Sequence, residues 1–203
     1  DAGIDDIAIV RGYLAETFTF DLKYFDNARW SETNMVASLQ SANEWLNKDD
    51  CIVSYSDIVY SSDAVKRLEN ADGDIVITYD PNWRKLWELR FEDPLSDAET
   101  FQLEGNRVIE IGHRASDIGE IQGQYMGLIK FTPKGWAMVL EYLKIFNQDQ
   151  MDKLDMTKLL QGLIKSDVVV NAIAIRDKWF EVDSELDLKI TNKGSSVEIN
   201  IAD

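Results

Sequence analysis

Residues 51–79 read CIVSYSDIVYSSDAVKRLENADGDIVITY and contain the alternation that decides the fold class. Two short apolar runs, at 51–55 and 74–79, are rich in Ile and Val and are typical of buried strands. The segment between them, 62–69, is predicted to form a helix. The turn-forming pair Asp72-Gly73 precedes the second run. The stretch therefore predicts a strand, a helix and a strand in succession.

The same alternation extends in both directions from this stretch. One region departs from it, because residues 87–111 contain short strands around the turn Glu104-Gly105-Asn106, which predicts an inserted hairpin region. Outside these segments, we expect strands at 4–10, 124–131, 168–175 and 195–201 and helices at 33–46, 133–146 and 156–165.

Strands that alternate with helices favour a three-layer α/β domain. We expect a Rossmann-like fold over residues 1–203, with a mostly parallel mixed sheet and a β insertion. A hydrophobic content of 45% is enough for one sizeable core. In such sheets ligands bind beyond the carboxyl ends of the strands. Polar residues that directly follow a strand are therefore the first candidates for a site.

The chain is strongly acidic, with 37 Asp and Glu residues against 21 Lys and Arg residues and a net charge of -16. This charge repels phosphate backbones and anionic lipid headgroups, so we expect neither nucleic acid nor a membrane as a partner. No apolar stretch approaches the roughly 20 residues that span a bilayer, and no signal peptide opens the chain, which favours a cytoplasmic location. A nucleotide substrate stays compatible with the charge if a divalent metal screens its phosphates.

Two carboxylates follow predicted strands and are candidates for a metal site. Asp57 comes after the strand at 51–55, and Asp183 comes after the strand at 168–175. Mg²⁺ takes few carboxylates together with waters and phosphate oxygens, so two acidic residues are an adequate site for a metal-bound triphosphate. The alternative is that each aspartate forms a turn or caps a helix.

Four separate segments carry a resemblance to the sugar-phosphate nucleotidyltransferases. Residues 2–13, AGIDDIAIVRGY, resemble the second strand region of that family. Residues 26–39, DNARWSETNMVASL, are similar to the Asn-rich segment and helix start of the branch that makes CDP-activated small amino alcohols and phosphonates. Residues 54–57, SYSD, and residues 179–188, WFEVDSELDL, resemble the segments that carry the two metal-binding aspartates, here Asp57 and Asp183.

The resemblance implies a Mg²⁺-dependent nucleotidyltransferase closest to the phosphocholine and 2-aminoethylphosphonate cytidylyltransferases. In that reaction a phosphate or phosphonate oxygen of the substrate attacks the α-phosphorus of the NTP, here CTP, and pyrophosphate leaves. Asp57 and Asp183 would hold the Mg²⁺. A sugar-1-phosphate with UTP or dTTP is the alternative substrate pair.

A cationic amine on the substrate needs acidic or aromatic groups around it. The candidates are Asp155, Trp83, Trp87 and Tyr125, and the resemblance places Asp155 where choline-type enzymes have a carboxylate that faces the amine. Asp155 is equally suited to cap the helix that follows it. The aromatic residues could instead belong to the core. Asn34 could contact the nucleotide or substrate, or cap its own helix.

The family also carries a glycine-rich loop of the form Gly-x-Gly-x-Arg after its first strand, and this loop cradles the triphosphate. The resemblance begins at the second strand region, so we expect the first strand, the loop and the following helix either to lie upstream of Asp1 or to be lost. The first case predicts an active enzyme that is incomplete in this chain. The second predicts a non-catalytic binding module with the same fold.

Overall fold

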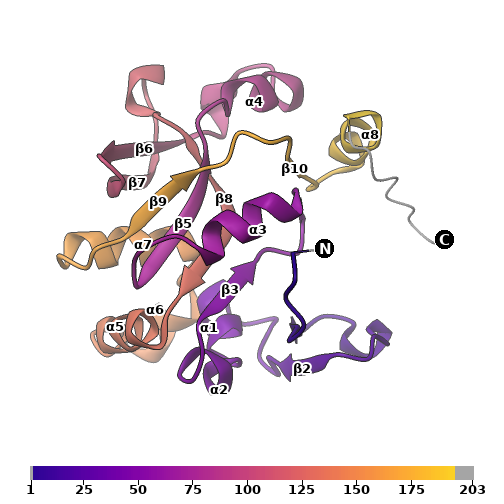
Figure 1. Cartoon of the computed structure of the whole chain (residues 1–203), viewed down its shortest axis with the longest axis vertical. Coiled ribbons are helices and arrows are strands. Elements are labelled where there is room, and N and C mark those ends of the chain that lie inside the picture. Colours follow the sequence, from indigo (N-terminus) through magenta and orange to yellow (C-terminus); the bar gives the residue numbers. More distant parts are fainter. Residues whose placement is uncertain (1, 195–203) are drawn as a thin grey trace.

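The computed structural model describes residues 2–194 and has an α/β architecture (Figure 1). The expected strand over 195–201 lies outside the described residues. The strands are β1 (Ala8–Arg11), β2 (Lys23–Asp26), β3 (Cys51–Ser54), β4 (Ile58–Val59), β5 (Ile75–Asp80), β6 (Glu99–Glu104), β7 (Arg107–Arg114), β8 (Gln124–Phe131), β9 (Asn171–Ala174) and β10 (Phe180–Glu181). The α-helices are α1 (Met35–Gln40), α2 (Asn43–Leu46), α3 (Ser62–Glu69), α4 (Arg84–Arg90), α5 (Pro133–Leu143), α6 (Gln148–Asp152), α7 (Met156–Lys165) and α8 (Glu185–Gly194).

A six-stranded mixed sheet with the order β3-β8-β5-β9-β7-β6 forms the centre of the molecule. β5 pairs in parallel with β9 and antiparallel with β8, and β8 pairs antiparallel with β3. β3, β5 and β9 therefore point the same way, and their carboxyl ends meet at one edge of the sheet. The α/β fold class predicted from the sequence is confirmed. The central sheet is mixed rather than mostly parallel, because β5–β9 is its parallel pair and the other pairs between its described strands are antiparallel.

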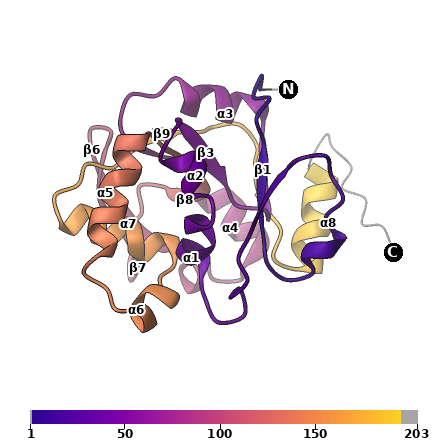
Figure 2. The same cartoon turned by 90° about the horizontal axis from the view of Figure 1, so that it is seen from below.

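Apolar residues of β5 alternate between two cores, one on each face of the sheet. Ile75 and Ile77 belong to the core that also contains α1, α5 and α7, whereas Val76 belongs to the core that contains α3 and α4. All three side chains are fully buried. This alternation follows from the two-residue period of a strand and produces three layers. Figure 2 shows α5 and α7 on one side of the molecule and α8 on the opposite side.

β1 and β2 form a separate two-stranded parallel sheet, and β3 is the edge strand of the central sheet. Arg11 on β1 holds Asp26 on β2 through two hydrogen bonds of 2.8 and 3.1 Å. Large apolar side chains in and around this unit are exposed, among them Ile7, Tyr13, Leu14, Phe20 and Trp30.

Several elements match the sequence prediction to the residue, namely α3, α7 and β8. The expected hairpin region contains β6 and β7, joined at Gly105, which takes a positive φ of 62°. Gly tolerates this left-handed conformation because it has no Cβ.

Two segments differ from the prediction. The helix expected over 33–46 is divided into α1 and α2, because Ala42 leaves helical geometry with a ψ of 16°. Residues 84–90 form the helix α4, although 87–90 were expected to begin the hairpin region; its Leu86 and Trp87 are buried one turn after Trp83. Burial of this apolar face outweighs the weak local pattern.

In the part of the chain that the structure describes, no helix combines enough length with enough apolar character to cross a bilayer.

Candidate functional site

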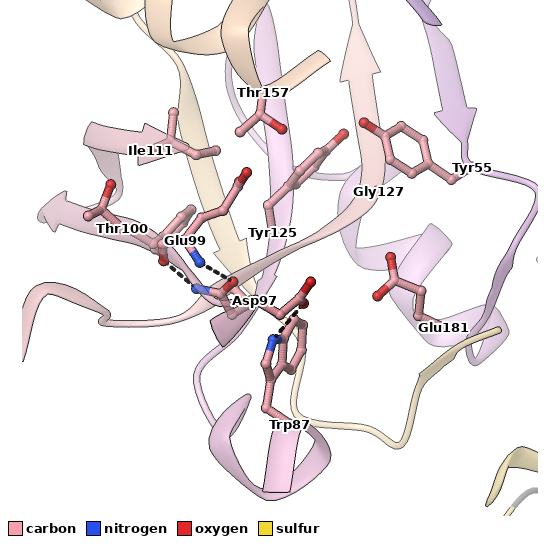
Figure 3. Close-up of a pocket in the computed structure, with 12 residues that line it drawn as sticks. Tyr55, Trp87, Asp97, Glu99, Thr100, Ile111, Tyr125, Gly127, Thr157 and Glu181 are labelled. Carbon is pink, nitrogen blue, oxygen red and sulfur yellow. Dashed lines mark hydrogen bonds between the residues drawn. The ribbon is translucent and has the colours of Figure 1, made fainter. Parts of the chain in front are cut away.

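A cavity of about 200 Å³ lies at the edge of the sheet where β3 and β5 end and β8 begins (Figure 3). Tyr55 enters it directly after β3, and Gln124 and Tyr125 enter it from the first residues of β8. Thr157 of α7 and Glu181 of β10 complete opposite sides. This position agrees with the rule that ligands of such sheets bind beyond the carboxyl ends of the strands.

The lining of the cavity is acidic. It includes the carboxylates of Asp97, Glu99 and Glu181, and among the described residues no Lys or Arg lines it. Burial raises the pKa of Glu99, and the charges of Asp155 and Asp97 raise it further. Asp97 and Glu99 thus lie close enough to affect one another in a partly desolvated space, while Glu181 is paired with Arg90.

Aromatic rings form one wall of the cavity. Tyr55 and Tyr125 pack edge to face with centroids 5.9 Å apart, and Figure 3 shows their hydroxyl ends directed toward one another. The hydroxyl of Tyr125 is buried without a hydrogen-bond partner among the described residues. Burial raises the pKa of both phenols, so both stay neutral near pH 7.

Hydrogen bonds orient the acidic lining, as the dashed lines in Figure 3 show. The indole nitrogen of Trp87 donates to Asp97 at 3.0 Å. The side chain of Gln124 accepts from the backbone nitrogen of Glu99 at 3.1 Å and donates to its carbonyl at 2.6 Å. These bonds hold the backbone of Glu99 in place, while its carboxylate lines the cavity.

A short pair of strands brings the backbone of Asp57 beside that of Val182, the residue before Asp183. β4 and β10 pair antiparallel, and the backbone nitrogen of Val182 donates to the carbonyl of Asp57 at 2.8 Å. Oδ1 of Asp57 is buried and has no hydrogen-bond partner among the described residues. A buried carboxylate oxygen without a donor is unusual, because its desolvation is otherwise uncompensated.

Arg90 is the last residue of α4. It forms ion pairs with three carboxylates near the C-terminal end of the described chain, in β10, in α8 and between them. Its nitrogens lie 2.5 Å from Glu181, 2.6 Å from Asp183 and 3.0 Å from Asp187. The side chain of Arg90 is only 3% exposed. Burial lowers its pKa, but the bonds to Glu181 and Asp187 outweigh that effect, and the net shift is upward.

Two aspartates selected from the sequence, Asp57 and Asp183, are the candidate ligands for a divalent ion. Within residues 2–194, no group of three or more His, Cys, Asp and Glu side chains is arranged to hold a metal ion. Mg²⁺, however, needs only one or two protein carboxylates when substrate phosphates and waters fill its other positions. Asp57 offers an unpaired Oδ1, and Asp183 offers a half-exposed side chain that also pairs with Arg90. In the strand register, however, Val182 rather than Asp183 lies opposite Asp57.

The other residues selected from the sequence divide into those near the cavity and those away from it. Tyr125 and one edge of Trp87 line it. Asp155 caps α7 by accepting a hydrogen bond from the backbone nitrogen of Lys158 at 2.8 Å. Its negative charge also raises the pKa of Glu99. Trp83 is 4% exposed in the core, and Asn34 caps α1 by accepting from Met35 at 2.7 Å; neither residue lines the cavity.

Sequence reasoning missed the acidic residues Asp97 and Glu99. It also missed Arg90, which pairs with three carboxylates. Asp97 and Glu99 lie in the expected hairpin region, where nothing local distinguishes a cavity carboxylate from a solvent-exposed one. Arg90 lacks a local signal because its partners follow it by about 90 positions.

Comparison with known structures defines the class of fold. The inositol-1-phosphate CTP transferase of T. maritima superposes with a TM-score of 0.63 at 16% identity, covering 81% of this chain and 61% of that one. A candidate glucose-1-phosphate thymidylyltransferase from Bacillus anthracis, solved with sucrose, superposes with a TM-score of 0.65 at 13% identity, covering 90% and 68%. The fold is that of the nucleotidyltransferases, and the chain spans about three-fifths of the T. maritima structure.

Comparison of sequences identifies the family, which the comparison of structures at 13–16% identity does not. No protein-family model matches the chain. The CTP:phosphoglutamine cytidylyltransferase of Campylobacter jejuni subsp. jejuni is 35% identical over 93% of this chain and 81% of its own length. The chain therefore belongs to the nucleotidyltransferase family of enzymes, as the resemblance of its motifs predicts.

Proposed function

We propose that the protein transfers CMP from CTP to the phosphate or phosphonate of a small compound that also carries an ammonium group. The observation that supports this proposal is the acidic and aromatic cavity beside the Asp57 and Asp183 strand pair. An oxygen of the acceptor attacks the α-phosphorus of CTP, the bond to the bridging oxygen breaks, and that oxygen leaves with pyrophosphate. No covalent intermediate with the protein is needed.

The charge of the cavity supports an amine on the acceptor. Asp97 and Glu99 line the cavity without a lining Lys or Arg, whereas Glu181 is already paired with Arg90, and the faces of the aromatic rings of Tyr55 and Tyr125 attract an ammonium group. The volume of about 200 Å³ lies below the roughly 300–1,000 Å³ of sites for drug-sized ligands, which favours a small head group. Phosphocholine and 2-aminoethylphosphonate meet both conditions, as does phosphoglutamine, the compound in the name of the Campylobacter relative.

CTP as the nucleotide is supported by the names of two similar proteins, the Campylobacter cytidylyltransferase and the T. maritima CTP transferase.

Asp57 and Asp183 would hold Mg²⁺, which when bound neutralises charge at the α-phosphate. The β4–β10 pairing holds the backbone segments that carry the two aspartates side by side. The protein also contributes a cavity wall that orients the amine end of the acceptor.

A matrix of pyrophosphate-release assays tests the proposal. CTP, UTP and dTTP are each combined with phosphocholine, 2-aminoethylphosphonate, phosphoglutamine and glucose-1-phosphate in the presence of Mg²⁺. We expect turnover with CTP and at least one of the amine-bearing acceptors, and none with glucose-1-phosphate. Turnover confined to glucose-1-phosphate with UTP or dTTP would support a sugar nucleotidyltransferase instead. Release from no combination by the full-length protein would support a non-catalytic binding module.

A further inference from the structure

The three carboxylates that line the cavity differ in whether the protein already supplies them with a partner. Asp97 accepts a hydrogen bond from the indole nitrogen of Trp87 at 3.0 Å. Glu181 is paired with Arg90. In the part of the chain that the structure describes, the carboxylate of Glu99 has neither a hydrogen-bond donor nor an ion-pair partner. Glu99 is therefore the carboxylate that is available to a ligand.

The surroundings of Glu99 favour a ligand that brings its own donor. Gln124 holds the backbone of Glu99 through two hydrogen bonds of 3.1 and 2.6 Å, so the start of its side chain is fixed. Burial raises the pKa of Glu99, which means that its charged form has lost part of its hydration. Lys158 is near enough to lower that pKa slightly, but its ammonium group is bound to Asp155 at 2.6 Å. A partly desolvated carboxylate without a donor is stabilised by a cation that donates hydrogen bonds to it.

Thr157 supplies a second free acceptor in the same cavity. Figure 3 shows the carboxylate of Glu99 directed toward the end of the cavity where Thr157 lies. Gly112 on β7 lets the backbone approach Thr157 closely, because a Cβ at that position would lie 2.5 Å from Cγ2 of Thr157. The hydroxyl of Thr157 makes no hydrogen bond within the described residues. It can therefore accept an N–H bond from a ligand that also contacts Glu99.

The aromatic rings of the cavity are already packed against other rings. The pairs are Tyr55 with Tyr125, Phe101 with Tyr79, and Trp87 with Trp179, at centroid distances of 5.9, 5.1 and 6.2 Å. A trimethylammonium group has no N–H to donate and is recognised by open ring faces that surround it as a cage. Packing in pairs covers part of the ring surface that such a cage needs. Free oxygen acceptors suit a group with N–H donors instead.

We propose that Glu99 and Thr157 select an acceptor whose amine is a primary ammonium group over one whose nitrogen is trimethylated. This inference rests on the proposed function and narrows it to acceptors such as 2-aminoethylphosphonate. Phosphocholine has the same charge but no N–H, so it leaves both oxygens of Glu99 and the hydroxyl of Thr157 without a donor. A hydrogen bond between charged partners is about twice as strong as a neutral one, so the loss of these donors is large enough to measure.

A series of acceptors with constant charge tests this preference. Phosphoethanolamine, its N-methyl and N,N-dimethyl forms and phosphocholine are all cationic at their nitrogen at pH 7, and they lose one N–H donor at each step. The KM of each is measured with CTP by pyrophosphate release. We expect KM to rise along the series and to be about tenfold higher for phosphocholine than for phosphoethanolamine. Equal values, or a lower KM for phosphocholine, would overturn the inference.

Substitutions assign the preference to the two residues. Glu99→Gln should reduce the KM ratio of phosphocholine to phosphoethanolamine to about threefold, because a neutral amide accepts weaker hydrogen bonds. Thr157→Val keeps the methyl group that packs against Gly112 but removes the hydroxyl, and it should also reduce the ratio. Glu104→Gln, at the exposed end of the same strand β6, is the matched control and should keep the wild-type ratio. An unchanged ratio in Glu99→Gln with a wild-type circular dichroism spectrum would reject the role of Glu99.

Failure of this inference is distinguishable from failure of the proposed function. If no amine-bearing acceptor, phosphoglutamine included, releases pyrophosphate with CTP, the proposed function fails and the preference fails with it. Turnover with phosphocholine that equals or exceeds turnover with phosphoethanolamine leaves the proposed function intact and rejects the preference alone. If the protein uses another amine-bearing acceptor in place of these two, the same comparison is made between that acceptor and its N,N,N-trimethyl form.

Discussion

The carbonyl oxygen of Asp57 accepts a hydrogen bond from the backbone nitrogen of Val182 at 2.8 Å. This bond continues the β4–β10 pairing by one position and sets Val182, the neighbour of Asp183, opposite Asp57. Two motifs that are far apart in the sequence are thus joined by main-chain bonds. Main-chain pairing of this kind constrains the position of each aspartate more firmly than side-chain contacts alone would.

Replacement of either proposed metal ligand should abolish most turnover. We expect Asp57→Asn and Asp183→Asn each to lower the rate of pyrophosphate release by about 100-fold or more, because an amide does not supply the negative charge that holds the ion. Far-UV circular dichroism should remain that of the wild type. Asp63→Asn, at an exposed ion pair with Lys66, is the control and should retain full activity. Near-normal rates in the first two variants would remove both residues from the mechanism.

Removal of divalent ions should have the same effect as loss of the ligands. Dialysis against EDTA is expected to stop pyrophosphate release, and addition of Mg²⁺ should restore it fully. The half-saturating concentration of Mg²⁺ should rise in Asp57→Asn, because one of its two protein ligands is weakened. Turnover that persists in EDTA would contradict a metal-dependent reaction.

Glu99 should make acceptor binding sensitive to pH. Its pKa is raised by burial and by the charges of Asp155 and Asp97, so it takes up a proton at a higher pH than an ordinary glutamate does. As pH falls through that value the cavity loses negative charge, and the KM for the amine-bearing acceptor should rise. Glu99→Gln should raise this KM at pH 7 and flatten its pH dependence. An unchanged KM at pH 7 would show that the ammonium group binds elsewhere.

The same pKa shift has a consequence for stability. A carboxyl group whose pKa is higher in the folded state binds its proton more tightly there, so the free energy of unfolding decreases as pH rises through the shifted pKa. Glu99→Gln removes this unfavourable charge, and the variant should be more stable than the wild type at pH 7. The difference should vanish in acid, where both side chains are neutral. Urea unfolding at several pH values measures it, and a less stable variant at pH 7 would contradict the prediction.

Asp155 can be tested for its two roles with a pair of substitutions. Asp155→Ala removes the cap of α7 and should lower the free energy of unfolding by about 1 kcal/mol. Asp155→Asn keeps an oxygen that accepts from Lys158 and should be nearly as stable as the wild type. If the carboxylate also attracts the acceptor amine, Asp155→Asn should still raise the acceptor KM. An unchanged KM in Asp155→Asn would limit Asp155 to its capping role.

The local elements of this fold could be predicted because their signals are local. The apolar runs that became β3, β5 and β8 and the segments that became α3 and α7 follow from a strand or helix period within a few residues. The motifs around Asp57 and Asp183 also lie within short segments, so their resemblance to nucleotidyltransferases was visible in the chain itself. The helix α4 was missed because its identity depends on burial against other elements rather than on its own pattern.

The amino-acid sequence by itself determined the α/β class, most strands and helices, and the family, because each of these depends on periodicity or on short contiguous motifs. Only the tertiary structure decided that Asp97, Glu99 and Glu181 share one cavity and that Arg90 holds the segment around Asp183. Those relationships join residues from separate elements, and a one-dimensional pattern contains no distance between them. Their charges and hydrogen bonds interact strongly only when folding removes the side chains from water and places them side by side.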